Sequence, residues 1–85
     1  MAEPAEASPG GSFEATPIAH FTVPWGAQEF QLQQLAFRGG GARLMRLRIR
    51  EGRRFTVIDL DAATVRDLAR AMGAWAEGEL AAARS

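Results

Sequence analysis

The sequence predicts an α+β fold, a four-stranded antiparallel β-meander packed on one C-terminal α-helix. Three observations lead to this class. From Met45 to Arg50, apolar residues alternate with arginine, and this period of two is typical of a strand with one dry face and one wet face. Glycines stand between the strand-like segments, where hairpin turns need them. From Val65 to Trp75, apolar residues recur at three- and four-residue steps, which predicts a helix.

The 85 residues are expected to form one domain with short flanking segments. We predict a disordered acidic tail at 1–17, a single β-β-β-β-α domain at 18–80 and a frayed C-terminus at 81–85. The tail is rich in Pro, Ala, Ser, Gly and Glu, and such a segment cannot bury enough apolar surface to offset its ordering entropy. Because chains this short bury only roughly 60% of their unfolded surface, dimerisation or docking on a larger partner is expected.

The first strand is predicted in the segment IAHFTVPW, with order beginning near Ile18. Its apolar residues of one parity are Phe21, Val23 and Trp25. Pro24 suits the end of an edge strand, because proline cannot donate a hydrogen bond to a neighbouring strand. His20 has the other parity, and we interpret it as a surface residue because no second histidine or cysteine could complete a metal site.

The second strand, EFQLQQLAFR, breaks its own alternation. Phe30 and Leu32 are in phase with each other, whereas Leu35 and Phe37 have the opposite phase. One extra residue resets the phase of a strand, so we predict a β-bulge at Gln33–Gln34 that lets both apolar pairs face the core. The three consecutive glycines that follow permit positive φ angles in a hairpin loop.

The third and fourth strands can be paired from the sequence. A type II′ turn with Gly52 and Arg53 at its centre sets their register. The register gathers the apolar residues on one face: Met45, Leu47, Ile49, Ile58 and Leu60. On the opposite face it sets Arg46 beside Asp59, Arg48 beside Val57, and Arg50 beside Phe55. A shift by one residue would bury the arginines, so the pattern specifies this register firmly.

The helix is expected to follow the fourth strand directly, with Asp61 as its N-cap. One stripe of the helix is apolar: Val65, Leu68, Met72 and Trp75. We expect this stripe to cover the apolar face of the hairpin. Gly78 and Glu79 indicate where the helix frays.

The composition argues against catalysis. Cysteine, lysine and tyrosine are absent and the serines lie in the terminal segments, so few groups could attack a substrate or carry a proton. The acidic pair Asp59 and Asp61 resembles a metal motif, but pairing with Arg46 and helix capping explain it better. We therefore predict no enzymatic activity, no catalytic residues, no metal site and no cofactor.

The N-terminus has acidic residues and no hydrophobic run, which argues against a secretory signal. No stretch approaches the roughly 18 consecutive apolar residues of a membrane span. We expect no membrane association and, by elimination, a cytoplasmic location. The formal net charge of +0 argues against holding nucleic acid by bulk charge.

One surface supports a functional hypothesis, and we name it the arginine face: Arg46, Arg48, Arg50, Phe55 and Val57. Guanidinium groups beside an aromatic ring suit carboxylates, phosphates and stacked bases, and both residue types are enriched in protein interfaces. We predict a small noncatalytic accessory module that forms a homodimer or docks on a larger protein partner through this face. The alternatives are single-stranded nucleic-acid binding on the same face, binding of a small ligand, and a solvated face whose long side chains cover apolar atoms.

The segments VPWGAQEF, RLRIREGRRFTVIDLDAAT and AWA resemble a group of short, uncharacterised proteins from alphaproteobacteria. That resemblance covers most of residues 21–76 and implies no activity. The order of four strands and one helix is similar to the layout of whirly-type and positive-cofactor-type transcription coactivators, which bind single-stranded DNA as dimers. This second resemblance is one of layout and involves no shared motif.

Overall fold

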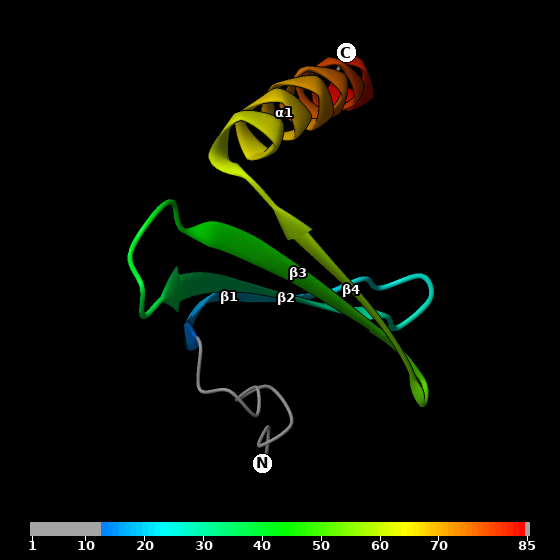
Figure 1. Ribbon diagram of the computed structural model, residues 1–85. Coiled ribbons are helices and arrows are strands. Elements are labelled where there is room, and N and C mark those ends of the chain that lie inside the picture. The colour runs from blue at the N-terminus through cyan, green and yellow to red at the C-terminus, as the bar shows by residue number, and fades with distance from the viewer. Residues whose placement is uncertain (1–12, 85) are drawn as a thin grey trace.

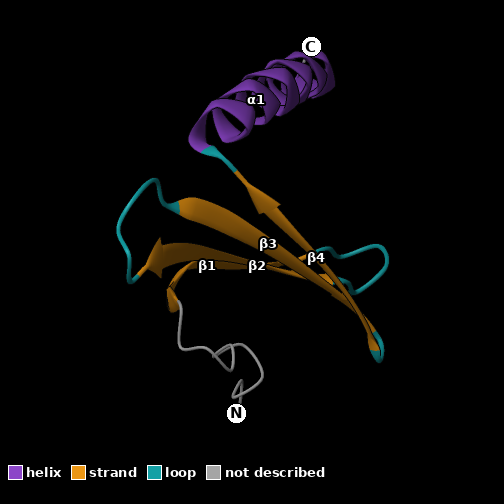
Figure 2. Ribbon diagram, viewed as in Figure 1, coloured by secondary structure: helices purple, strands orange, loops and turns teal. Residues whose placement is uncertain are grey.

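The computed structural model of the chain describes residues 13–84, and residues 1–12 of the tail predicted at 1–17 lie outside this range. The elements are β1 (Phe13–Thr22), β2 (Glu29–Phe37), β3 (Leu44–Glu51), β4 (Arg54–Leu60) and α1 (Ala62–Arg84). The strands form one antiparallel sheet in the order β1-β2-β3-β4, and α1 follows β4 (Figures 1 and 2). The predicted α+β fold class is confirmed.

Two predicted boundaries are wrong. β1 begins at Phe13 instead of near Ile18, because the preceding segment continues the strand and pairs with the far end of β2, Phe13 opposite Phe37. α1 continues past Gly78 to Arg84, over the stretch predicted to fray. Its last turns are rich in alanine, the best helix former, and Arg84 lies where the helix dipole favours a positive charge.

The β3–β4 register agrees with the prediction at every pair. Met45 lies opposite Leu60 at one end, and Glu51 lies opposite Arg54 beside the turn. Gly52 has φ of 60°, whereas Arg53 is not among the described residues with positive φ. A positive φ at the first central position alone is the signature of the predicted type II′ turn.

The predicted β-bulge at Gln33–Gln34 is wrong. β2 pairs with β3 in unbroken register from Glu29 to Leu35, and the extra residue lies in β1, where the register shifts between Pro17 and Ala19. The two apolar pairs of β2 therefore face opposite sides of the sheet. Phe30 and Leu32 share a face with Met45, Leu47 and Ile49, whereas Leu35 and Phe37 share the arginine face.

The arginine face consequently has a small apolar cluster of its own. The ring of Phe13 meets the ring of Phe37 edge-on, with centroids 6.0 Å apart. Leu35 lies on the same face and is only 1% exposed, the one fully buried hydrophobic residue among residues 13–84. Phe13, expected in a disordered tail, thus packs against Phe37 on the face that contains the most buried side chain of the described chain.

The helix covers much less of the sheet than expected. α1 lies above the face of the sheet opposite the arginine face (Figure 1). Asp61 is the only residue between β4 and α1, and the helix contacts the sheet mainly near its own beginning. Asp61 caps the helix as predicted, because its carboxylate accepts hydrogen bonds from the backbone N–H of Thr64, at 3.4 Å, and from the Thr64 hydroxyl, at 2.6 Å. The stripe beyond Val65 is left exposed to solvent.

Candidate interaction surfaces

Arg46 is held by two neighbours on the arginine face. Its Nε and Nη2 donate to the two carboxylate oxygens of Asp59, at 2.8 and 3.1 Å. Its guanidinium carbon also lies 5.2 Å from the ring centroid of Phe13. This two-point geometry is the strongest form of an arginine–carboxylate pair, and it arises because the β3–β4 register places the two residues directly opposite each other.

Arg48 and Arg50 are engaged in the same way across the sheet. The guanidinium of Arg48 stacks over the ring of Phe55 at 4.3 Å and donates to Gln31 Oε1 at 2.9 Å. Arg50 forms an ion pair with Glu29 of β2. These contacts extend the row of paired charges and stacked rings across β2, β3 and β4.

Glu29 of this row has basic side chains on both sides, Arg50 and His20. Its hydrogen bond with Arg50 lowers the pKa of the Glu29 carboxyl below its ordinary value, and His20, whose Nε2 lies 3.4 Å away, acts in the same direction. A carboxylate that is held ionised in this way keeps its arginine partner neutralised. His20 itself is exposed, as expected.

The structure therefore brings together all five predicted residues, but their guanidinium groups already bind groups of the same sheet. Phe55 and Val57 remain about half-exposed beside them. That the arginine face binds a partner stays a prediction. The residues of this face are Arg46, Arg48, Arg50, Phe55 and Val57.

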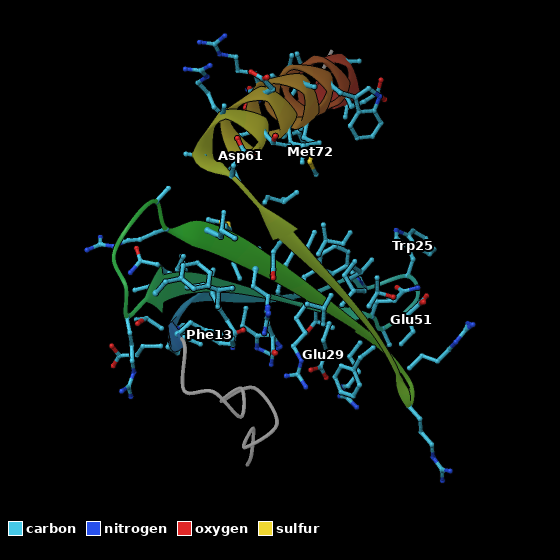
Figure 3. All side chains as sticks on the ribbon, viewed as in Figure 1. Phe13, Trp25, Glu29, Glu51, Asp61 and Met72 are labelled. Atoms are coloured by element: carbon cyan, nitrogen blue, oxygen red, sulfur yellow. The ribbon has the colours of Figure 1, made fainter. Side chains whose placement is uncertain are left out.

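The opposite side of the sheet has the larger apolar exposure. The stripe of α1 is in solvent, with Met72 66% and Trp75 71% exposed, and Figure 3 shows Met72 on the side of α1 that overlooks the sheet. Across from it, Phe21 and Ile58 are also exposed on the sheet. We call these surfaces together the open apolar side: Ile18, Phe21, Ile58, Leu68, Met72, Trp75 and Leu80.

A shallow hollow of about 320 Å³ lies where α1 leaves the sheet. It is lined mainly by apolar side chains of the sheet and of the first helical turns, with two arginines among them: Ile18, Gln34, Arg43, Leu44, Met45, Leu60, Ala62, Val65 and Arg66. The hollow exists because Val65 reaches the sheet while the rest of the stripe diverges from it. It is therefore the narrow end of the open apolar side.

Trp25 is a further exposed residue, at 97%, in the turn between β1 and β2 (Figure 3). The turn is closed by two backbone hydrogen bonds of 2.8 Å, from the N–H of Val23 to the carbonyl of Gln28 and from the N–H of Ala27 to the carbonyl of Val23. Gln28 also donates to Glu51 at 3.2 Å, which ties this turn to the end of β3. The sequence placed Trp25 at a strand end but did not predict such complete exposure.

Within residues 13–84, no group of three or more histidine, aspartate or glutamate side chains is arranged to hold a metal ion. The described part of the chain also contains no helix that is long and apolar enough to cross a membrane. The candidate surfaces are thus made of apolar, arginine and aromatic side chains.

The open apolar side was not predicted from the sequence, because the helix stripe was expected to belong to the core. One signal was available: the stripe continues beyond Val65 through Leu68, Met72 and Trp75, which is more apolar surface than a helix anchored at its first turns needs. A helix that begins one residue after a strand can cover its own sheet only if the short connection lets the helix axis bend back over the sheet.

The model of the family DUF6967, a family of unknown function, matches residues 12–78. No curated protein and no solved structure matches the chain significantly. The family match confirms the expected family of unknown function. The alphaproteobacterial origin and the likeness to whirly-type coactivators stay predictions.

Proposed function

The chain belongs to DUF6967, a family of unknown function, and we propose that it acts as a small noncatalytic protein-interaction module. Its docking surface is the open apolar side. The arginine face serves mainly to stabilise the sheet, through ion pairs and stacking that the strands make with one another.

The exposure of the α1 stripe is the observation that supports this role. Met72 and Trp75 are among the largest apolar side chains of the molecule, yet both are about two-thirds exposed. Covering these two alone would contribute on the order of 2–4 kcal/mol, from about 1.5–3 kcal/mol for full burial of each side chain. A single exposed hydrophobic residue needs no explanation, whereas a stripe that continues along one helix favours a binding surface.

The pairing of the arginines favours this assignment over nucleic-acid binding on the arginine face. A phosphate would have to displace Asp59 from Arg46 and Glu29 from Arg50, and both carboxylates would then repel it. A protein partner on the open apolar side requires no such exchange.

Site-specific photocrosslinking tests the proposal. A photoreactive amino acid placed at Met72 in the living cell should yield covalent adducts with protein, because that position faces the docking surface. The matched control is the same amino acid at Ala74, two residues along α1 and therefore on the opposite side of the helix.

Adducts from position 72 and none from position 74 would support the proposal. Equal adducts from both positions, or adducts from neither, would refute it. The mass of the adduct further shows whether the partner is a second copy of the chain or a different protein.

A further inference from the structure

We infer that the partner on the open apolar side is a second copy of this chain, joined by antiparallel pairing of the two β4 edges with the two α1 helices side by side. This inference rests on the proposed function and names its partner. It is carried by the difference between the two sheet edges, by the position of α1 and by the exposed apolar area.

The two edges of the sheet are built differently. The β1 edge contains Pro17 and the register shift next to it, and both features hinder pairing with another strand. β4 contains neither feature and is paired with β3 without interruption from Arg54 to Leu60. Figure 2 shows β4 along the outer side of the sheet, with no strand beyond it. β4 is therefore the edge that remains able to accept a strand.

The hydrogen-bonding pattern indicates which groups of β4 are available. Glu51 and Arg54 flank a two-residue turn and so form the hydrogen-bonded pair beside it. Alternation then directs the backbone N–H and C=O groups of Phe55, Val57 and Asp59 away from β3. Overlapping β4 fully with a second, antiparallel β4 centres the pair on Val57 and places these outward groups opposite one another.

This pairing brings the two helices together. A two-fold axis at Val57, perpendicular to the sheet, keeps both copies of α1 on the same side, and the helices then run antiparallel.

The exposed apolar area near β4 is a large part of what a dimer needs. Five side chains of the open apolar side lie on β4 and α1 and are between 42% and 71% exposed: Ile58, Leu68, Met72, Trp75 and Leu80. With about 200 Å² for a large side chain in full exposure, they present on the order of 550 Å² of apolar surface. A standard stable interface takes about 800 Å² from each partner, so these side chains alone account for about two-thirds of it.

Sedimentation equilibrium of the purified full chain tests the inference. We expect a particle of twice the 9.2 kDa chain mass. Met72→Glu should weaken association by about 30-fold or more, the factor that corresponds to an interface hot spot. Ala74→Glu, with the same charge on the opposite side of α1, should leave association unchanged, and circular dichroism checks that both variants keep their helix.

A second variant tests the proposed contact between the two β4 strands directly, by cross-linking them. The sequence contains no cysteine, so Val57→Cys introduces a single thiol at the proposed two-fold axis. Mild oxidation should join two copies of this variant through a disulfide, because paired strands hold opposite Cα atoms within the 4.4–6.8 Å, roughly, that a disulfide spans. Ala74→Cys should give no such product under the same conditions.

A chain that stays monomeric up to roughly 100 μM, where even a micromolar dimer would be populated, would overturn the inference. So would a dimer that Met72→Glu leaves intact, or one in which Val57→Cys and Ala74→Cys cross-link equally. If the chain is monomeric but photocrosslinking at position 72 captures a different protein, the second-copy inference fails and the proposed function stands. If it is monomeric and position 72 captures nothing, both fail.

Discussion

Leu35→Ala is expected to remove a large part of the stability of this chain. Leu35 is 1% exposed and lies in β2, an inner strand of the sheet, so truncation leaves a cavity as well as removing buried apolar surface. Such substitutions cost about 2–5 kcal/mol, and about 3 kcal/mol is expected here. A chain of this length has a free energy of unfolding of about 4–13 kcal/mol in total, at about 0.05–0.15 kcal/mol per residue.

The matched control is Leu68→Ala, the same truncation on the α1 stripe. Leu68 is 42% exposed in the single chain, so its truncation should cost about 1 kcal/mol or less at low protein concentration. Urea unfolding followed by circular dichroism measures both variants against the unaltered chain. Repeating the measurement at high protein concentration should enlarge the effect of Leu68→Ala, which a second copy would bury, and leave the effect of Leu35→Ala unchanged.

A cost of Leu35→Ala no larger than that of Leu68→Ala at low protein concentration would contradict the prediction. That result would mean that the apolar cluster of the arginine face does not hold the sheet together. The stability would then have to come from the hairpin face that α1 overlooks.

Two further predictions concern the charges of the arginine face. A double-mutant cycle of unfolding free energies with Arg46→Met and Asp59→Asn should give a coupling energy of about 0.5–1 kcal/mol at low salt. Because the pair is partly exposed, this coupling should shrink in high salt. Zero coupling at low salt would contradict the structural role of the pair. The pKa of Glu29 is lowered from its ordinary 4.5 and that of Asp61 from its ordinary 3.8. Both carboxylates therefore stabilise the fold fully at pH values above these ordinary pKa values. This stability is lost as the pH falls through their lowered pKa values. Glu29→Gln should make thermal stability less dependent on pH below 4.5 in melting experiments, and an unchanged slope would refute the prediction.

The β3–β4 hairpin could be predicted in full because all the information is local. The turn at Gly52 fixes which residues pair. Any register shifted by one residue is unfavourable, because it would bury the arginines. The two constraints agree, and each pair of the hairpin follows from them, including the contact of Arg46 with Asp59. The cap at Asp61 is local in the same sense.

The bulge could not be placed for the opposite reason. The phase break in β2 shows that one apolar pair must face away from the other or that a residue must be inserted somewhere. Whether β2 has apolar residues on both faces or contains a bulge depends on which side chains cover each face. Phe13 covers part of the arginine face because β1 extends to pair it with Phe37. The alternation of Phe13, Ala15 and Pro17 was a visible signal, but the composition of the tail concealed it.

Local sequence patterns were sufficient to predict the order of the elements, the register of the hairpin and the division of its faces into arginine and apolar residues. What each face contacts depends on the three-dimensional arrangement of the strands and the helix. This arrangement paired the guanidinium groups with carboxylates and rings of neighbouring strands, and it held α1 away from the sheet, so that the apolar side was left uncovered. The physical reason is that periodicity records which side chains share a face, whereas the contacts of a face depend on strands and helices distant in the sequence.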